Sequence, residues 1–155
     1  MGLSTRVPAW IPVFNPIARL LLAAGVPMGP NVLITIRGRK TGVPRTTPVT
    51  VVESAGRRWL IAPFGEVNWV RNLRAAGRAT ITIRRRNVEV TAVEMEPGDR
   101  VAFFRDVLAP LVRQYGKLVL WIVRNIDRID IDNPVESAVG RPVFELYPAD
   151  GLSTQ

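Results

Sequence analysis

Short β-branched runs bounded by glycine and proline are the feature that most constrains the fold of this chain. Val, Ile and Thr are stiff at the first side-chain torsion and suit a pleated surface, so each run predicts a strand. Strands are expected at residues 32–36, 49–52, 59–62, 79–83, 88–93 and 141–148. The first three follow one another closely, which predicts three neighbouring antiparallel strands. The runs at 79–83 and 88–93 alternate with period two and predict a further hairpin.

Apolar residues at helical spacing lie between these runs. Residues 68–77 predict a helix that carries Trp69, Leu73 and Ala76 on one face and ends at a glycine. Asn72, one turn from Trp69, is expected on the side that faces the preceding loop. Further helices are expected at residues 17–24, 100–115 and 118–126. Antiparallel strands close on themselves to hide their edges, so this order predicts an α+β fold, a small barrel of mostly antiparallel strands with flanking helices.

The length of 155 residues fits one domain with enough chain to bury a core. We expect an apolar N-terminal segment with a short helix at 1–30, the barrel domain at 31–148 and a polar tail at 149–155. Four prolines between residues 7 and 28 interrupt the apolar segment, so we do not expect it to span a membrane. It either packs on the barrel or touches a membrane surface, and packing is the preferred interpretation.

A glycine-bounded cationic loop lies between the first two expected strands. Residues 38–48 contain Arg39, Lys40 and Arg45, with three threonines and two prolines. The glycines let a ligand approach the backbone, and guanidinium, ammonium and hydroxyl groups suit phosphate or carboxylate oxygens. An anion cradle and a solvated basic turn are equally open from these residues alone. A Walker loop and a dinucleotide fingerprint are excluded, because a strand rather than a helix follows.

Charge and missing residue types narrow the function. The chain has 21 Lys and Arg against 13 Asp and Glu, a net charge of +8 that favours anionic partners. It has no Cys and no His, which excludes disulfides, thiolate nucleophiles, Cys or His zinc sites, His-ligated haem and Ser-His-Asp triads. If the chain is an enzyme, we expect a cofactor to perform the hard chemistry.

Acidic residues gather towards the C-terminus. Asp127, Asp130 and Asp132 alternate with isoleucines, next to Arg124 and Arg128. A metal site is conceivable, but a solvated charge network is the preferred interpretation, and no metal is expected.

Several motifs occur in order along the chain. They are Gly38-Arg39-Lys40-Thr41-Gly42, Pro44-Arg45, Pro48, Pro63-Phe64-Gly65, residues 68–75 and residues 141–146. At this spacing they resemble the deazaflavin-dependent nitroreductase family of actinobacteria. The resemblance extends from about residue 31 to residue 92 and resumes near residue 141. That family uses coenzyme F420 on a split β-barrel related to flavin-binding pyridoxamine phosphate oxidases. The resemblance therefore implies a split barrel and an F420-dependent oxidoreductase.

The resemblance also implies cofactor-binding residues. In this family the basic loop holds the phosphate and acidic tail of F420, the proline after it flanks the deazaflavin, and residues 62–65 and the following helix border the ring pocket. The implied residues are Arg39, Lys40, Thr41, Gly42, Arg45, Thr47, Pro48, Ala62, Pro63, Phe64, Gly65, Trp69 and Asn72. No catalytic residue is assigned, since hydride transfer from the ring needs only a dry, aligned pocket.

The implied reaction is hydride transfer between F420 and a small or lipophilic organic acceptor, a quinone-like or nitro compound. Pro63 stands where the best-known nitroreductase members have a serine, and Tyr115 alone replaces their tyrosine-rich segment, which favours a quinone-like or lipid-like acceptor. The alternative is a non-catalytic F420 or fatty-acyl binding protein on the same fold. FMN is the second choice of cofactor, and nucleic acid is disfavoured because the tryptophans do not alternate with the basic runs. We expect a cytoplasmic monomer or homodimer, with any peripheral membrane contact made by the N-terminal segment.

Overall fold

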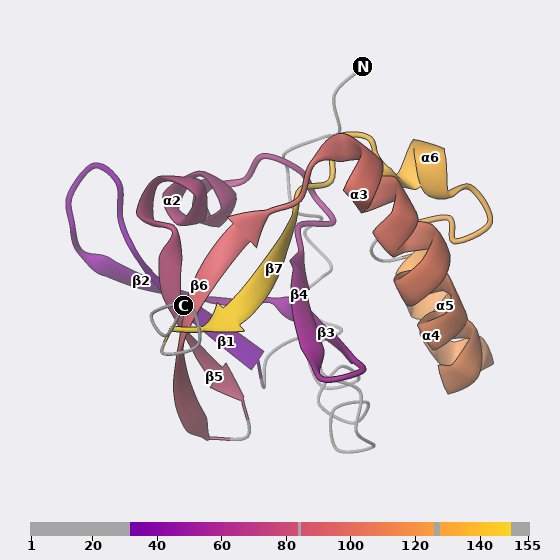
Figure 1. Cartoon of the computed structure of the whole chain (residues 1–155), viewed down its shortest axis with the longest axis horizontal. Helices are drawn as coiled ribbons and strands as arrows, with labels where there is room; N and C mark the ends of the chain where they lie inside the picture. The colour runs from indigo at the N-terminus through magenta and orange to yellow at the C-terminus, as the bar shows by residue number, and fades with distance from the viewer. Residues whose placement is uncertain (1–31, 84, 126–127, 150–155) are drawn as a thin grey trace.

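A curled antiparallel sheet forms the centre of the computed structural model, which describes residues 32–83, 85–125 and 128–149 (Figure 1). The strands are β1 (Val32–Arg37), β2 (Pro44–Pro48), β3 (Thr50–Ser54), β4 (Arg57–Ile61), β5 (Arg78–Ile83), β6 (Arg86–Glu94) and β7 (Val143–Pro148). Their order is β2-β1-β5-β6-β7-β4-β3, with every neighbouring pair antiparallel. The expected N-terminal helix and nearly all of the expected polar tail lie outside the described residues.

One segment of the chain supplies both edges of this sheet. β2 pairs with β1 at one edge, and β3 pairs with β4 at the other. These two strands are separated only by Val49, whose N–H donates to the Val32 carbonyl at 3.0 Å. The sheet therefore curls back on itself, and a bend in one segment joins its first and last strands.

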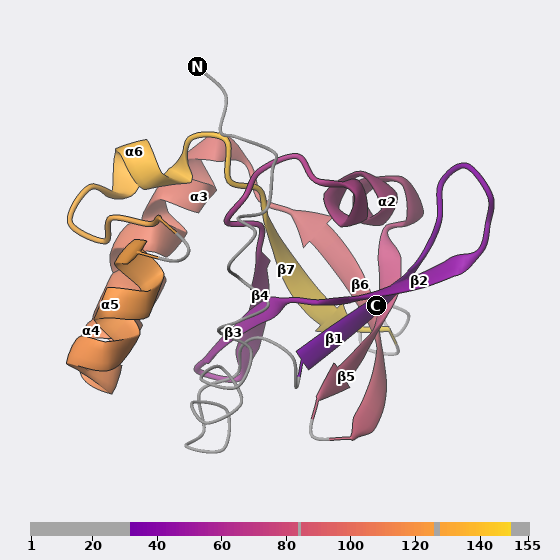
Figure 2. The ribbon, with the colours of Figure 1, turned by 180° about the vertical axis from the view of Figure 1, so that it is seen from behind.

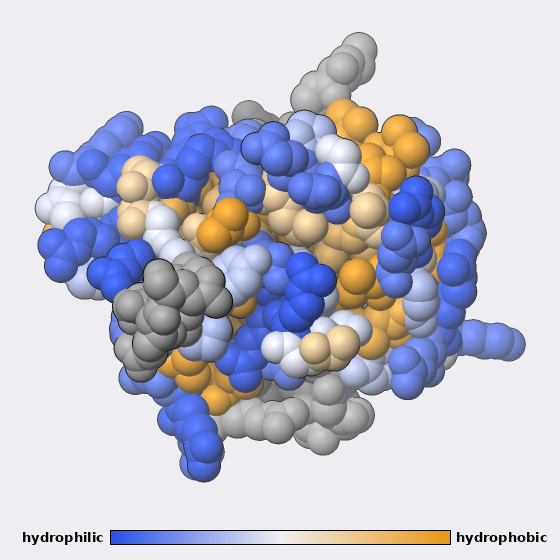
Figure 3. Space-filling view, in the orientation of Figure 1, coloured by the Kyte–Doolittle hydropathy of each residue, from blue (hydrophilic) through white to orange (hydrophobic). Residues whose placement is uncertain are grey.

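Helices lie on two sides of the barrel (Figures 1 and 2). On one side, α2 (Asn68–Ala76) packs on β1, β5 and β6. On the other side are α3 (Pro97–Phe103), the π-helical turn η2 (Phe104–Leu108), α4 (Ala109–Tyr115), α5 (Lys117–Asn125) and α6 (Pro134–Ala138). On the face in Figure 3, mostly hydrophilic residues cover the β1–β2 hairpin, and hydrophobic residues reach the surface on the side of α3 and α6.

Strand β4 connects the two hydrophobic clusters. Successive side chains of a strand point to opposite faces, so Leu60 packs inside the barrel while Trp59 and Ile61 pack against the helices. The inner cluster includes Ile34, Val70, Leu73, Ile81 and Phe144. The outer cluster includes Phe103, Phe104, Val112, Val119 and Val123. Burial on both faces sets the register, because a slip by one residue would exchange the two sets of side chains.

Two expectations about the strands are wrong. Residues 44–48, expected in a loop, form β2, where Pro44 and Pro48 stand opposite Arg37 and Leu33. Proline is tolerated there because β2 is an edge strand, in which a missing N–H costs no ladder hydrogen bond. β1 is also not a neighbour of β3 and β4. It lies between β2 and β5, because the chain bends away after β2.

Most other elements agree with the sequence. The helix predicted at 68–77 is confirmed as α2, and Gly77 ends it with φ 67° and an N–H that donates to the Leu73 carbonyl at 2.7 Å. Ala76, expected on the buried face, is exposed, and Val70 packs in its place.

The predicted fold class, an antiparallel barrel with flanking helices, is confirmed. The second hairpin is β5–β6, and the long helical region is α3–η2–α4, with a π-helical turn that the sequence did not indicate. Within the described residues, no helix combines the length and the apolar character needed to cross a membrane.

Candidate functional site

A hollow of about 230 Å³ lies between the β1–β2 turn and α2. Its lining consists of Gly38, Arg39, Lys40, Thr41, Arg45, Asn68 and Asn72. All of these except Gly38 and Asn68 belong to the predicted set of binding residues. Two hairpin strands present the basic turn, and one face of α2 presents two asparagines one turn apart. The structure thus brings the predicted loop and the predicted helix residue Asn72 to one site.

Hydrogen bonds inside the turn set its shape. The Gly38 N–H donates to the Val43 carbonyl, and the Gly42 N–H donates to the Gly38 carbonyl, both at 2.9 Å. Gly42 has φ 74°, a left-handed conformation that favours glycine. A Cβ at Gly38 would lie 3.1 Å from the Val43 carbonyl oxygen and 3.2 Å from Thr41 Oγ1. The backbone conformation of Gly42 and the crowding around Gly38 therefore both favour glycine in this turn.

A direct contact joins the turn to α2. The backbone N–H and the Nη1 of Arg39 both donate to Oδ1 of Asn72, at 3.2 and 2.7 Å. Asn72 is only 5% exposed, whereas Arg39 lies at the surface. A buried amide oxygen that accepts two hydrogen bonds holds one orientation. Helix α2 therefore positions both the turn and the guanidinium of Arg39.

The hollow carries an excess of positive charge. Residues 32–52 contain four basic residues and no acidic residue. Lys40 and Arg45 make no hydrogen bond or ion pair with any residue that the structure describes. The first turn of α2 has no acidic residue and Val67 gives no side-chain cap, so the partial positive charge of the helix N-terminus adds to that of the basic side chains. This arrangement suits an anion with several oxygens.

Ion pairs hold α2 in place beside the hollow. Arg74 donates to both carboxylate oxygens of Glu66 at 2.8 Å, and to Glu94 at 2.7 and 2.8 Å. These hydrogen bonds raise the pKa of the Arg74 guanidinium and lower the pKa of the Glu66 carboxyl. Glu66 precedes α2 and Glu94 ends β6, so the two-sided fork ties the helix to its entry loop and to the sheet.

The other predicted binding residues lie outside the lining of this hollow. They are Gly42, Thr47, Pro48, Ala62, Pro63, Phe64, Gly65 and Trp69. Residues 62–65 lie in the connection from β4 to α2. The Ala62 side chain packs in the barrel core with 1% exposed, which leaves its backbone as the part able to face a ligand, and Trp69 packs partly buried on the same core. Their contact with a cofactor stays a prediction.

A buried arginine, absent from the predicted set, holds the 62–65 connection. Arg141 is 5% exposed and donates from Nε to the Pro63 carbonyl at 3.2 Å. Its Nη1 donates to the Ser137 carbonyl at 2.9 Å, and its Nη2 to the Arg128 carbonyl at 2.6 Å. The guanidinium thus joins the connection to α6 and to the segment after α5. The sequence feature that could have indicated this residue is its position at the start of the 141–146 motif, which leads into β7.

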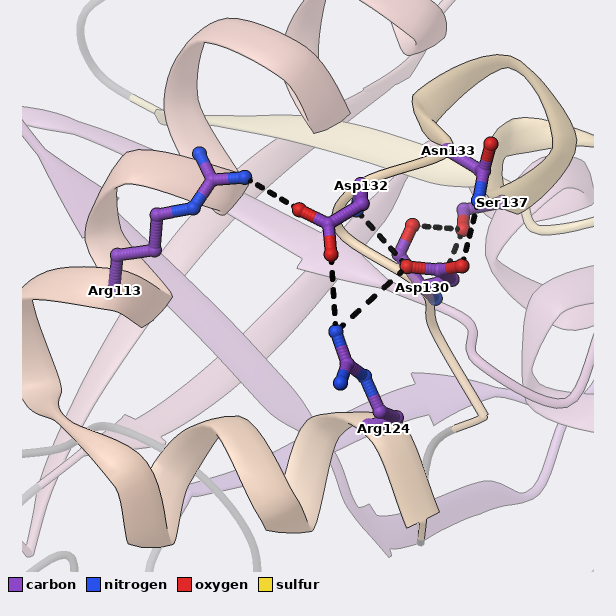
Figure 4. A network of polar contacts seen from close by, with 6 residues as sticks. All are labelled: Arg113, Arg124, Asp130, Asp132, Asn133 and Ser137. Carbon is purple, nitrogen blue, oxygen red and sulfur yellow. Dashed lines mark hydrogen bonds and ion pairs between the residues drawn. The ribbon is translucent and has the colours of Figure 1, made fainter.

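The predicted carboxylate network forms with an unexpected partner (Figure 4). Asp132 accepts hydrogen bonds from Arg113 at 2.8 Å and Arg124 at 3.1 Å, and Asp130 lies 4.0 Å from Arg124. A hydrogen bond from the Asn133 side chain is the main cause that lowers the pKa of Asp130. The network joins α4, α5 and the loop before α6.

Two expected members have no place in this network. Asp127 lies outside the described residues, and the Arg128 side chain makes no ion pair within them. Arg128 has φ 56° and contributes its carbonyl to Arg141. In the part of the chain that the structure describes, no group of three or more His, Cys, Asp or Glu could hold a metal ion.

Comparison with known proteins identifies the family of this chain. Residues 21–128 match the family model of F420H(2)-dependent quinone reductases, which is more than half of the chain. The chain belongs to this family. The predicted deazaflavin family and its coenzyme F420 are therefore confirmed, and the chain belongs to a family of F420-dependent reductases.

Solved structures are similar to this chain. A proposed 5-nitroimidazole antibiotic resistance protein from Bacteroides thetaiotaomicron is 11% identical, over 84% of this chain and 80% of that chain, with a TM-score of 0.53. An F420-H2 dependent reductase is 22% identical over 75% and 92% of the two chains, with a TM-score of 0.47. A pyridoxinephosphate oxidase family protein from Clostridium acetobutylicum is 10% identical over 88% and 84%, with a TM-score of 0.42. The likeness to the Bacteroides protein supports the barrel fold.

Proposed function

We propose that the hollow between the β1–β2 turn and α2 binds the phosphodiester and the acidic tail of F420, and that the chain uses reduced F420 to reduce a lipophilic organic acceptor such as a quinone. The observation that carries this proposal is the convergence of Arg39, Lys40 and Arg45 on one hollow that has no acidic lining residue. The donor set fits the coenzyme, whose phosphate and glutamate carboxylates are all anionic acceptors.

Each lining residue has a distinct role in this proposal. Lys40 and Arg45 would hold the phosphate and the tail, because their charges are exposed and lack partners among the described residues. Arg39, held by Asn72, would add its remaining guanidinium donors in a preset position. The Thr41 hydroxyl accepts from the Val43 N–H at 3.2 Å, and its own proton is left to donate to an anion.

When bound, F420 supplies the hydride through its deazaflavin ring. The part of the chain is to align the ring and exclude water. We place the ring beside Pro48 and the 62–65 connection, which Arg141 holds through the Pro63 carbonyl. The Pro63 side chain is apolar and offers no hydroxyl donor to a substrate beside the ring. It therefore favours an apolar acceptor over one that must be held by a hydroxyl group.

The test compares Lys40→Ala and Arg45→Ala with Arg86→Ala, a matched loss of one exposed charge at the β5–β6 turn. F420 is titrated by fluorescence, and reduction of menadione by reduced F420 is measured in parallel. We expect each hollow variant to lose roughly 1.5–3 kcal/mol of binding free energy, the range for hydrogen bonds to charged groups, and Arg86→Ala to bind as wild type does.

Two outcomes would contradict the proposal in different ways. If both hollow variants bind F420 as tightly as Arg86→Ala, the anionic part of F420 is held elsewhere on the chain. If the wild type binds F420 but reduces no acceptor in a panel of quinones and nitro compounds, the chain is a carrier rather than a reductase.

A further inference from the structure

The α4–α5 hairpin, residues 109–125, carries an unusual concentration of exposed apolar side chains. Tyr115 is 41% exposed, Leu118 is 56% exposed and Trp121 is 49% exposed. Among the described residues, the other large hydrophobic side chains that are exposed are all valines, at scattered positions. Every exposed aromatic or leucine side chain of the described chain therefore falls within one seven-residue stretch.

Helical spacing gathers these side chains at one end of the hairpin. α4 ends at Tyr115 and α5 begins at Lys117, with Gly116 between them at φ 95°. Leu118 and Trp121 are three residues apart on α5, so they are neighbours on its outer face. The opposite face of α5 is used by the core, where Val119 and Val123 are 4% exposed. The tip is thus amphipathic, with one face packed on the core and one face whose apolar side chains are about half exposed.

The charge of the hairpin has a single sign. Residues 107–125 contain Arg113, Lys117 and Arg124 and no acidic residue. Asp132 accepts from Arg113 and Arg124 (Figure 4), whereas Lys117 makes no ion pair with the described residues. The cation beside the apolar tip is therefore available to an external anion, and the net charge of +8 adds a long-range attraction to anionic surfaces.

From these observations we infer that the tip of the α4–α5 hairpin docks on the surface of an anionic lipid bilayer. Trp and Tyr have an apolar body with a polar end and favour the membrane interface, while Lys reaches from apolar surroundings towards phosphate groups. The nine residues of α5 are far fewer than the roughly 20 that a spanning helix needs, so the hairpin lies on the bilayer and does not cross it.

A second copy of the chain fits this surface less well. A two-fold contact would bring Lys117 and its symmetry mate together, and like charges oppose association. Three side chains also provide much less than the roughly 800 Å² per partner that a stable interface buries. In both ribbon views the hairpin and the β1–β2 turn lie at opposite sides of the molecule, so docking leaves the F420 hollow open (Figures 1 and 2).

The test uses the full chain and sedimentation with phosphatidylcholine vesicles, with and without phosphatidylglycerol. We expect wild type to bind the anionic vesicles, and the double variant Leu118→Ser with Trp121→Ser to bind at least tenfold more weakly. Val135→Ser, a matched change of a side chain that is 65% exposed on α6, should bind within twofold of wild type. F420 affinity and thermal unfolding of the double variant should match wild type, which separates this test from that of the coenzyme site.

Two charge-reversal variants test the electrostatic part of the binding. Lys117→Glu should weaken binding to anionic vesicles at least fivefold, and Arg86→Glu, the same change at the β5–β6 turn, should not. The inference is overturned if the double variant binds as Val135→Ser does, if the two Glu variants bind equally, or if wild type prefers neutral vesicles. Loss of a wild-type dimer in the double variant, seen by analytical ultracentrifugation, would assign the surface to a second copy instead.

Discussion

Two substitutions of Asn72 test separately how its contact with Arg39 affects the stability of the fold and how the charge of the hollow affects F420 binding. In Asn72→Ala, the Arg39 N–H and Nη1 lose the oxygen that lies 3.2 and 2.7 Å away. An intramolecular hydrogen bond contributes about 1 kcal/mol and more when charged, but the exposed guanidinium can turn to water. We therefore expect the free energy of unfolding to fall by about 1 to 2 kcal/mol.

Asn72→Asp keeps the acceptor and adds a negative charge inside the hollow. The free energy of unfolding should fall less than in Asn72→Ala, since both hydrogen bonds can form and the Arg39 guanidinium offsets part of the cost of burying the carboxylate. F420 affinity should fall about tenfold in Kd, or about 1.4 kcal/mol, because the added carboxylate repels the anionic groups of the coenzyme and offsets part of the charge of Arg39. The two substitutions thus change stability and binding in different proportions.

Urea unfolding followed by tryptophan fluorescence measures the first quantity, and F420 titration measures the second. Asn68→Asp is the matched control, because Asn68 lines the hollow and has no hydrogen bond to Arg39. It should weaken F420 binding as Asn72→Asp does. Wild-type stability of Asn72→Ala would show that the contact does not stabilise the fold, and wild-type affinity of both Asp variants would refute an anion in this hollow.

Two further predictions concern buried charges. Arg141→Met leaves three carbonyls without their donor and should lower the free energy of unfolding by about 3 kcal/mol, with partial recovery in Arg141→Lys; an unchanged Tm would contradict this. Glu145 accepts from Arg57 at 2.7 Å, which lowers its pKa below the ordinary 4.5, so the stability it contributes above pH 4.5 is lost as the pH falls through the lower folded value. In Arg57→Gln, the free energy of unfolding measured with urea between pH 3 and 7 should depend less on pH than in wild type. Equal pH dependence in the two proteins would contradict a stabilising Arg57–Glu145 ion pair.

Local patterns predicted most of the elements and the basic part of the site. The glycine at 77 ends α2 as expected, because a left-handed residue stops a helix whatever the helix packs against. Arg39, Lys40 and Arg45 lie in one tight turn, so their proximity follows from the chain itself. The sequence did not predict the π-helical turn or the exposure of Ala76, because both depend on packing, which periodicity does not describe.

By itself, the sequence determined the short β-branched strands, the helix after the 62–65 connection, the cationic turn and its suitability for an anion, because each depends on neighbours in the chain. Only the tertiary structure decided that residues 44–48 pair with β1, since an edge position is what makes two prolines acceptable in a strand. It also decided the contact of Arg39 with Asn72, 33 residues away, and that of Arg141 with Pro63, 78 residues away. These contacts exist because barrel closure brings distant segments together, and no spacing along the chain carries that information.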